Sequence, residues 1–336
     1  MKIAILTQPL LRNYGCILQN YALQTVLRRQ GHDVKTIDYI YPHTSFIILL
    51  LSWIKTLVYY MIGKKTRRFA RFQKADSRAP LMDDFVSKNL SMTKIVRSYS
   101  KRQFMKYGFD CAVVGSDQVW RPKYNQHLKD MFLYFLKKIS IKRIAYAASF
   151  GSEEWEFSQK QTKICSALAQ KFDALSVREE DGVALCKKYL DIDATWVLDP
   201  TLLLEKEDYL LLCSNVPKTQ NNFLIVYLLD VNESVKLFCE NEAKKRGLAV
   251  RFFTAGSKAT LSVPEWLAMF RDAAYVVTDS FHGTVFSIIF KKEFRCFYNE
   301  KRGTARFESL LKLYKSGKLD EMRDFSLKWL KNALET

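Results

Sequence analysis

Residues 2–39 read KIAILTQPLLRNYGCILQNYALQTVLRRQGHDVKTIDY. The run KIAILT (2–7) is apolar and β-branched, which predicts a strand, and DVKTIDY (33–39) has the composition of a second strand. Between them a loop leads into an amphipathic helix that ends at Gly31, a residue type common at helix C-termini. A strand, a helix and a strand in so short a stretch predict a βαβ unit with parallel strands.

The same design recurs along the rest of the chain. The runs at 109–116 and 141–152 are apolar and end in small or polar residues, which predicts buried strands with loops at their carboxyl ends, and the other runs given below predict further strands. The first set comprises FDCAVVGS (109–116), IKRIAYAASFGS (141–152), ALSVREE (174–180) and TWVLDPTLLL (195–204). The second set comprises NNFLIVYLLD (221–230), LAVRFFTAG (248–256), AYVVTDS (274–280) and EFRCFY (293–298).

Two such arrays predict an α/β protein with two Rossmann-like, doubly wound domains that face a cleft. We expect an N-terminal domain at 1–205, with an apolar and basic insertion at about 43–107. A C-terminal domain follows at 206–336, and its final helix could cross back onto the first domain.

Composition limits the classes of function. The chain has 336 residues, of which 48% are hydrophobic, and this excludes a disordered chain. Its net charge of +18 favours anionic partners, namely nucleic acid, anionic lipid or phosphorylated substrates. The seven cysteines are scattered and none forms a C-x-x-C pair, which favours a reducing cytoplasm. No histidine neighbours a cysteine or another histidine, so we expect no metal site and no bound cofactor.

Residues 46–62, FIILLLSWIKTLVYYMI, hold 14 apolar residues in 17. The sequence that follows, KKTRRFARFQK (64–74), contains six basic residues and no acidic one. An apolar helix beside a polybasic run is typical of a helix that lies on an anionic membrane. The alternative is a buried helix followed by a solvated basic helix. A full membrane span is less favoured, because it needs about 20 apolar residues.

Two loops carry groups suited to a sugar. The first opens a helix with Asn13, Tyr14 and Gly15, followed by Gln19, where free backbone N–H groups could bind an anion or a hydroxyl. Its alternative is an ordinary turn between strand and helix.

The second loop contains Ser116, Asp117, Gln118 and Trp120. Asp117 could accept a hydrogen bond from a sugar or act as a base, and Trp120 could stack on a sugar ring. The alternative is a helix-capping Asp with a core Trp. We predict that acceptor binding involves Asn13, Tyr14, Gly15, Gln19, Ser116, Asp117 and Gln118.

Two further loops carry cationic and acid–base groups. Arg178 follows a strand and suits a carboxylate or phosphate, unless Glu179 or Glu180 pairs with it on the surface. His282 lies in TDSFHGT (278–284), at the carboxyl end of a strand and the start of a helix. A histidine gains and loses a proton near neutral pH, although a structural capping role is the alternative.

The ordered set of motifs resembles the polysaccharide pyruvyl transferase family. The motifs are NYGCILQNYAL (13–23), FDCAVVGSDQVW (109–120), YAASFG (146–151), SVREEDG (176–182), VLDPTLLL (197–204) and VVTDSFHGTVFSIIF (276–290). The resemblance spans nearly the whole chain and is weakest at 43–75.

The resemblance implies a fold similar to the GT-B glycosyltransferases. It also implies transfer of pyruvate from phosphoenolpyruvate (PEP) to a saccharide, usually as a ketal, with release of phosphate. His282 and Arg178 match the family's functional groups, and we predict them as catalytic. Some members have an Arg where this chain has Ser280, and Arg306 is a possible substitute. Cys16 stands where many members have Gly. The predicted PEP-binding residues are Arg178, Ser280, Phe281, His282, Gly283 and Arg306.

Other functions remain open on the residues alone. One is a GT-B glycosyltransferase that uses a nucleotide sugar. Another is a non-catalytic protein that binds membrane or nucleic acid through its basic stretch. No helix-turn-helix or RNA-binding signature occurs, so nucleic acid is not an expected partner. We expect a cytoplasmic enzyme, peripheral at the inner face of the membrane, that modifies a hexose in a lipid-linked precursor of capsule or other surface polysaccharide.

Overall fold

A computed structural model describes residues 1–41, 46–62, 77–125, 127–220, 222–230, 233–256, 259–298 and 303–335. The basic run at 64–74, for which a solvated helix was one expectation, lies outside these residues.

The first sheet is parallel and has the strand order β2-β1-β3-β4-β5-β6. Its strands are β1 (Lys2–Leu6), β2 (Asp33–Thr36), β3 (Cys111–Val114), β4 (Lys142–Ala148), β5 (Ala174–Val177) and β6 (Thr195–Trp196). The helices of this part are α1 (Tyr14–Arg29), α3 (Pro80–Asn89), α4 (Lys101–Lys106), α5 (Gln159–Ala169) and α6 (Glu180–Leu185). The βαβ unit expected at 2–39 is present as β1, α1 and β2, with parallel pairing.

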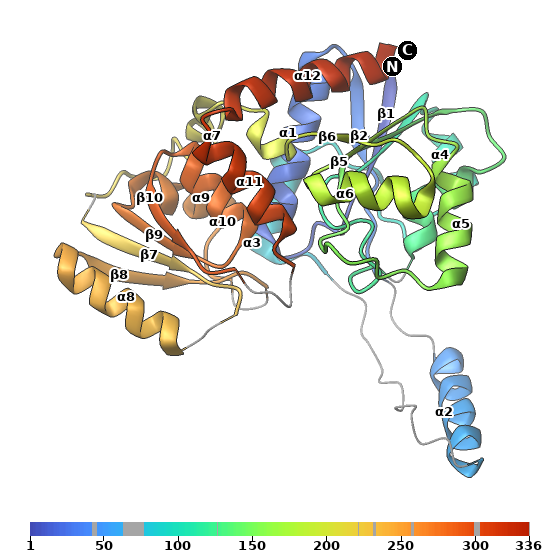
Figure 1. Ribbon diagram of the computed structural model, residues 1–336, viewed down its shortest axis with the longest axis horizontal. Helices are drawn as coiled ribbons and strands as arrows, with labels where there is room; N and C mark the ends of the chain where they lie inside the picture. Colours follow the sequence, from blue (N-terminus) through green and yellow to red (C-terminus); the bar gives the residue numbers. More distant parts are fainter. Residues whose placement is uncertain are drawn as a thin grey trace.

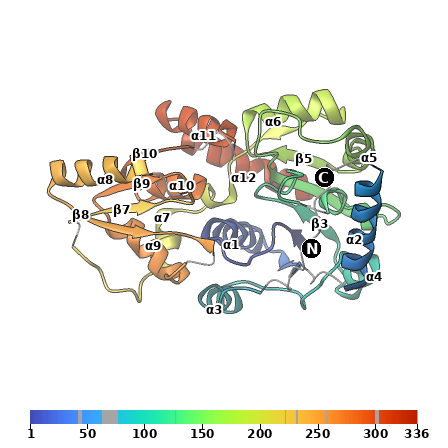
Figure 2. The same ribbon diagram turned by 90° about the horizontal axis from the view of Figure 1, so that it is seen from below.

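The second sheet is also parallel, with the order β10-β9-β7-β8. Its strands are β7 (Phe223–Tyr227), β8 (Ala249–Phe253), β9 (Tyr275–Thr278) and β10 (Glu293–Cys296). Its helices are α8 (Glu233–Arg246), α9 (Val263–Asp272), α10 (Phe281–Ile289) and α11 (Ala305–Lys315). Figure 1 shows the two sheets as separate lobes, and Figure 2 shows α1 between them.

The connection between the sheets differs from the expected strand at 195–204. Only Thr195–Trp196 pair with β5, and a short 3₁₀ helix, η4 (Pro200–Leu202), follows before α7 (Lys206–Leu212). Asp199 starts this turn, because its carboxylate accepts the backbone N–H of Thr201 at 3.0 Å. Leu202 and Leu203 then pack into the hydrophobic core instead of extending the sheet.

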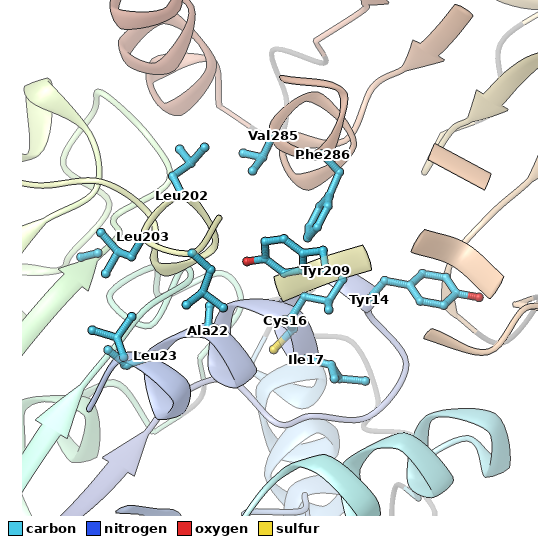
Figure 3. Close-up of a cluster of buried hydrophobic side chains, with 14 of the residues drawn as sticks. Tyr14, Cys16, Ile17, Ala22, Leu23, Leu202, Leu203, Tyr209, Val285 and Phe286 are labelled. Atoms are coloured by element: carbon cyan, nitrogen blue, oxygen red, sulfur yellow. The ribbon is translucent and has the colours of Figure 1, made fainter. Parts of the chain in front are cut away.

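The core between the lobes is built around the start of α1. Asn13 caps this helix, because its side chain accepts the N–H groups of Gly15 and Cys16. Tyr14 stacks on Trp266 of α9 with ring centroids 5.3 Å apart, and its hydroxyl donates to the carbonyl of Leu261 at 2.6 Å. Figure 3 shows that side chains of α1, η4, α7 and α10 meet in one cluster.

The final helix, α12 (Leu319–Glu335), reaches the first sheet. Lys142 of β4 donates to the carbonyl of Leu334 at 2.9 Å, and the N–H of Leu198 donates to the hydroxyl of Ser326 at 3.0 Å. The last element of the chain therefore packs against the first lobe, near both termini (Figure 1).

Helix α2 (Phe46–Met61) stands away from both sheets in Figure 1. Among the described residues, no helix combines the length and the hydrophobicity needed to cross a bilayer.

Candidate active site

A cavity of about 270 Å³ lies between the two lobes. Most of its lining residues belong to the segments that come directly after the carboxyl ends of strands β1, β3, β7 and β9. In each sheet the strand order reverses at one place, between β1 and β3 and between β7 and β9. Ligands of doubly wound sheets bind at such reversal points, so the topology places a binding site where the two reversal points face each other. The lining residues are Gln8, Asn13, Cys16, Asp117, Gln118, Tyr124, Leu229, Asp279, Ser280, Phe281, His282 and Arg306.

His282 lies in the first turn of α10 and lines the cavity. Ser280 caps the helix by accepting the N–H of Gly283 at 3.3 Å. On one side of the imidazole is Gly15, where a Cβ would come within 2.0 Å of His282 Nδ1. On the other side His282 Nε2 lies 3.7 Å from Asp199 Oδ2, and Nε2 makes no hydrogen bond. The ring is held between a glycine and a carboxylate.

Asp199 is fully buried and is the centre of the polar network behind the cavity. Its carboxylate accepts hydrogen bonds from Arg178 Nη1 at 2.7 Å, Thr201 Oγ1 at 2.6 Å and Ser116 Oγ at 3.3 Å. Burial acts to raise the pKa of Asp199, but His282, Arg178 and Thr201 outweigh it and lower the pKa below its usual value. A buried carboxylate in this setting stays ionised.

Arg178 lies behind the cavity wall, with 1% of its side chain exposed. Besides Asp199, its guanidinium meets Asp117 (Nη2 to Oδ1, 3.5 Å) and lies 4.7 Å from the centre of the Phe281 ring. Burial acts to lower the pKa of Arg178, but Asp199, Asp117 and Glu179 raise it, so this group is a permanent cation.

Arg306 of α11 reaches the cavity from the second lobe. Its guanidinium lies 5.7 Å from the centre of the Phe281 ring, so Arg178 and Arg306 share that ring. Burial, followed by the charge of Arg178, lowers the pKa of Arg306 to about 10. Arg306 therefore remains a cation at neutral pH, in a place where positive charge is crowded.

The structure brings only part of the predicted site to the cavity. Of the predicted residues, the lining includes Asn13, Asp117, Gln118, Ser280, Phe281, His282 and Arg306. Tyr14, Gly15, Gln19, Ser116, Arg178 and Gly283 lie outside it.

The predicted residues outside the lining have structural contacts. Gln19 Nε2 donates to Thr7 Oγ1 at 3.0 Å, and Gln19 Oε1 accepts the N–H of Ser116 at 3.2 Å. Gly283 abuts Thr278, where a Cβ would come within 2.2 Å of Oγ1. Trp120 takes its core alternative, because it is fully buried, stacks on Phe132 and donates to the carbonyl of Met131.

Sequence reasoning missed several residues of the site. The lining also includes Gln8, Cys16, Tyr124, Leu229 and Asp279. Asp279 was inside a motif of interest, and its carboxylate accepts the N–H groups of Leu229 and Asp230. Asp199 could also have been predicted as a site residue. It is a polar residue followed by a proline near the end of a predicted strand, and ligands bind at the carboxyl edge of such sheets. Cys16 gave little signal, and burial raises the pKa of its thiol.

No group of three or more potential metal ligands occurs within the part of the chain that the structure describes.

Comparisons with known proteins concern family and fold. Residues 13–301 match the model of the family described as polysaccharide pyruvyl transferase. A search of curated proteins found no significant sequence match to this chain.

Solved structures that are similar to this chain share little sequence with it. S. aureus MnaA, solved with UDP, has 8% sequence identity and a TM-score of 0.53, covering 97% of this chain and 91% of MnaA. The UDP-GlcNAc 2-epimerase of Methanocaldococcus jannaschii has 13% identity and a TM-score of 0.46, covering 88% of this chain and 83% of the epimerase. E. coli heptosyltransferase WaaC has 7% identity and a TM-score of 0.40, covering 94% of this chain and all of WaaC (100%).

The MnaA match and the two parallel sheets confirm the expected fold class, α/β with two Rossmann-like domains in a GT-B-like arrangement. The family match covers most of the chain and includes the loops that carry His282, Asp199 and Asp117. The chain belongs to the polysaccharide pyruvyl transferase family.

Proposed function

We propose that the cavity transfers the pyruvyl group of PEP to a saccharide as a ketal and releases phosphate. The observation that supports this most is His282, which lines the cavity with Nε2 unbonded and 3.7 Å from the buried carboxylate of Asp199. The reaction needs a proton donor for the PEP methylene carbon. Imidazole is the side chain best suited to give and take a proton near neutral pH, and His282 presents its Nε2 at the cavity.

In the proposed reaction, protonated His282 donates a proton to C3 of PEP, which becomes a methyl group. Positive charge develops at C2, and a sugar hydroxyl oxygen bonds to C2 while its proton returns to His282. The C2–O bond to phosphate then breaks. A second hydroxyl bonds to C2 and closes the ketal, and its proton leaves with the phosphate. Atoms and protons balance, and no metal or cofactor takes part in these steps.

The anionic groups of PEP need cations that touch the cavity. Arg306 meets this need, together with the first turn of α10, whose N–H groups carry partial positive charge. Arg178 is better suited to acting through Asp199, because only 1% of its side chain is exposed. Asn13, Asp117 and Gln118 line the first-lobe side and suit the hydroxyl groups of a saccharide.

We propose further that the acceptor is a hexose of a lipid-linked precursor of capsule or other surface polysaccharide. The enzyme would then work at the cytoplasmic face of the membrane, with an anionic lipid surface rather than nucleic acid as its partner. The support is the sequence of 46–74, in which 14 of the first 17 residues are apolar and six of the last 11 are basic.

The test is an incubation of the purified protein with PEP and candidate glycans, with phosphate release and product mass as readouts. We expect phosphate release that depends on the glycan, and a product that carries one pyruvylidene group. The same glycans with nucleotide sugars should give no transfer. Release of a nucleoside diphosphate, without any turnover of PEP, would make the protein a glycosyltransferase instead.

His282→Ala should lower kcat by about 10²–10⁴, the usual contribution of general acid–base catalysis. His32→Ala is the matched control, because His32 lies between α1 and β2 and is not among the residues that line the cavity. Undiminished pyruvylation by the His282 variant would remove this residue from the mechanism.

A further inference from the structure

Helix α2 exposes a surface that is almost entirely apolar. Seven aliphatic or methionine side chains in and just after it are 43–72% exposed: Leu50, Leu51, Ile54, Leu57, Val58, Met61 and Ile62. Among the α2 side chains that the structure describes, the buried ones are Leu49 and Thr56. The only charged residue in 46–62 is Lys55. A soluble monomer rarely exposes a continuous apolar surface of this kind, so the surface indicates a partner.

The adjacent sequence indicates the chemistry of that partner. Residues 64–74 contain six basic residues and no acidic one. At an anionic bilayer, apolar side chains enter the boundary between headgroups and acyl chains, and nearby Lys and Arg are attracted to the headgroups. A second copy of the chain fits less well, because it would bring the same positive charge close to itself. With 16 residues, α2 is short of the roughly 20 needed to cross, so it would lie in the plane of the membrane.

The segment between Tyr41 and Arg78, which carries α2, is attached beside the cavity at both ends. It leaves after Tyr41, whose hydroxyl donates to the carbonyl of Tyr124 at 3.4 Å, and Tyr124 lines the cavity. It returns at Arg78, whose Nε donates to the carbonyl of Leu10 at 2.7 Å. Leu10 belongs to the loop between β1 and α1, which also forms part of the cavity wall. Figure 1 shows α2 on the side of the molecule opposite to both termini.

We propose that α2 lies in the plane of an anionic membrane and holds the mouth of the cavity toward the lipid headgroups. The binding by α2 stands independently of the enzyme activity. The significance of the orientation rests on the proposed function, since a lipid-linked saccharide would reach the cavity directly from the membrane surface.

Binding is tested by co-sedimentation with phosphatidylcholine vesicles that contain about one third phosphatidylglycerol. The variant is Leu51→Ser with Leu57→Ser, and the matched control is Leu211→Ser with Leu237→Ser, at positions that are 73% and 59% exposed elsewhere. We expect the α2 variant to lower the partition coefficient at least tenfold and the control to leave it unchanged. Equal binding by both would overturn the proposal. So would a wild-type dimer in lipid-free solution that the α2 variant converts to monomer.

Orientation is tested with a fluorophore on a single introduced cysteine, which is feasible because six native cysteines are buried and Cys296 is half-buried. Lys123→Cys labels the residue next to Tyr124, and Lys331→Cys labels α12 near the termini. With a quencher on the lipid headgroups, we expect stronger quenching at 123 than at 331. Equal or reversed quenching would contradict the orientation.

Neither experiment uses PEP. Vesicle binding without pyruvyl transfer would leave the α2 proposal intact and remove the proposed function, and pyruvyl transfer without vesicle binding would do the reverse.

Discussion

Gly15 sets the position of His282, because the imidazole occupies the space that any other side chain would need. We expect Gly15→Ala to displace the ring, since the new Cβ would lie 2.0 Å from Nδ1. Alanine favours a helix over glycine by up to about 1 kcal/mol, so the fold itself should not weaken for lack of helix propensity. The measurement is kcat together with the melting temperature. A fully active Gly15→Ala enzyme would show that the ring position is not critical.

Asp199 should make the protein sensitive to acid. Its pKa is lowered in the folded state by His282 and Arg178 against the effect of burial, so its stabilising effect is complete above the unfolded-state value of about 3.9. That stabilisation is lost as the pH falls from there toward the folded-state pKa, by about 1.4 kcal/mol per pH unit.

The change that isolates this effect is Asp199→Asn. We expect it to lower the free energy of unfolding by about 3 kcal/mol at pH 7, because it leaves the buried Arg178 without its closest anion. Denaturant unfolding between pH 7 and pH 3 should show this difference shrinking below about pH 4. A difference that stays constant with pH would mean that Asp199 is not ionised in the folded protein.

At the scale of elements, Asp279 ties β9 to the loop after β7 and so shapes the cavity wall. Its carboxylate accepts the N–H of Leu229 at 2.6 Å and that of Asp230 at 2.9 Å. Hydrogen bonds to a charged group contribute about 1.5–3 kcal/mol each. Asp279→Ala should therefore speed hydrogen exchange of these two amides about tenfold or more, while the amides of α8 keep their rates. Unchanged exchange at Leu229 would show that other contacts hold the loop.

The strands were largely predictable from sequence, and the site only partly. All ten strands of the two sheets fall within the expected runs. The central strands are buried, and buried parallel strands leave a clear apolar signature, whereas β8 and β10 at the edges of the second sheet are largely exposed. The run TWVLDPTLLL (195–204) was wrongly predicted to be a strand along its whole length. Its leucines pack into the core from a turn, and in sequence buried leucines of a turn look the same as buried leucines of a strand. The partnership of Asp199 with His282 was not predictable, because it joins residues from different lobes and no local pattern records it.

For the whole molecule, the main hydrophobic cluster includes residues of both lobes, and Tyr14 lies where they meet. Its ring stacks on Trp266 at 5.3 Å and its hydroxyl bonds to Leu261, so one residue of α1 holds the second lobe by two different interactions. A cavity held between lobes needs this junction to be rigid. Because the core is continuous, we expect both sheets to unfold together in denaturant.

Two substitutions separate the contributions of Tyr14. Tyr14→Phe keeps the stacked ring and loses the hydrogen bond to Leu261, which should cost about 1 kcal/mol. Tyr14→Ala removes the ring as well and should cost about 3–5 kcal/mol, the range for large aromatic side chains in a core. Pulsed hydrogen exchange read on peptides from β3–β4 and from β7–β9 measures both lobes at once. We expect Tyr14→Ala to lower the denaturant concentration at which both sheets unfold. The two sheets should then either still unfold together, or the second sheet should unfold at a lower concentration than the first. If the wild-type sheets already unfold at different denaturant concentrations, the junction at Tyr14 does not couple the two lobes.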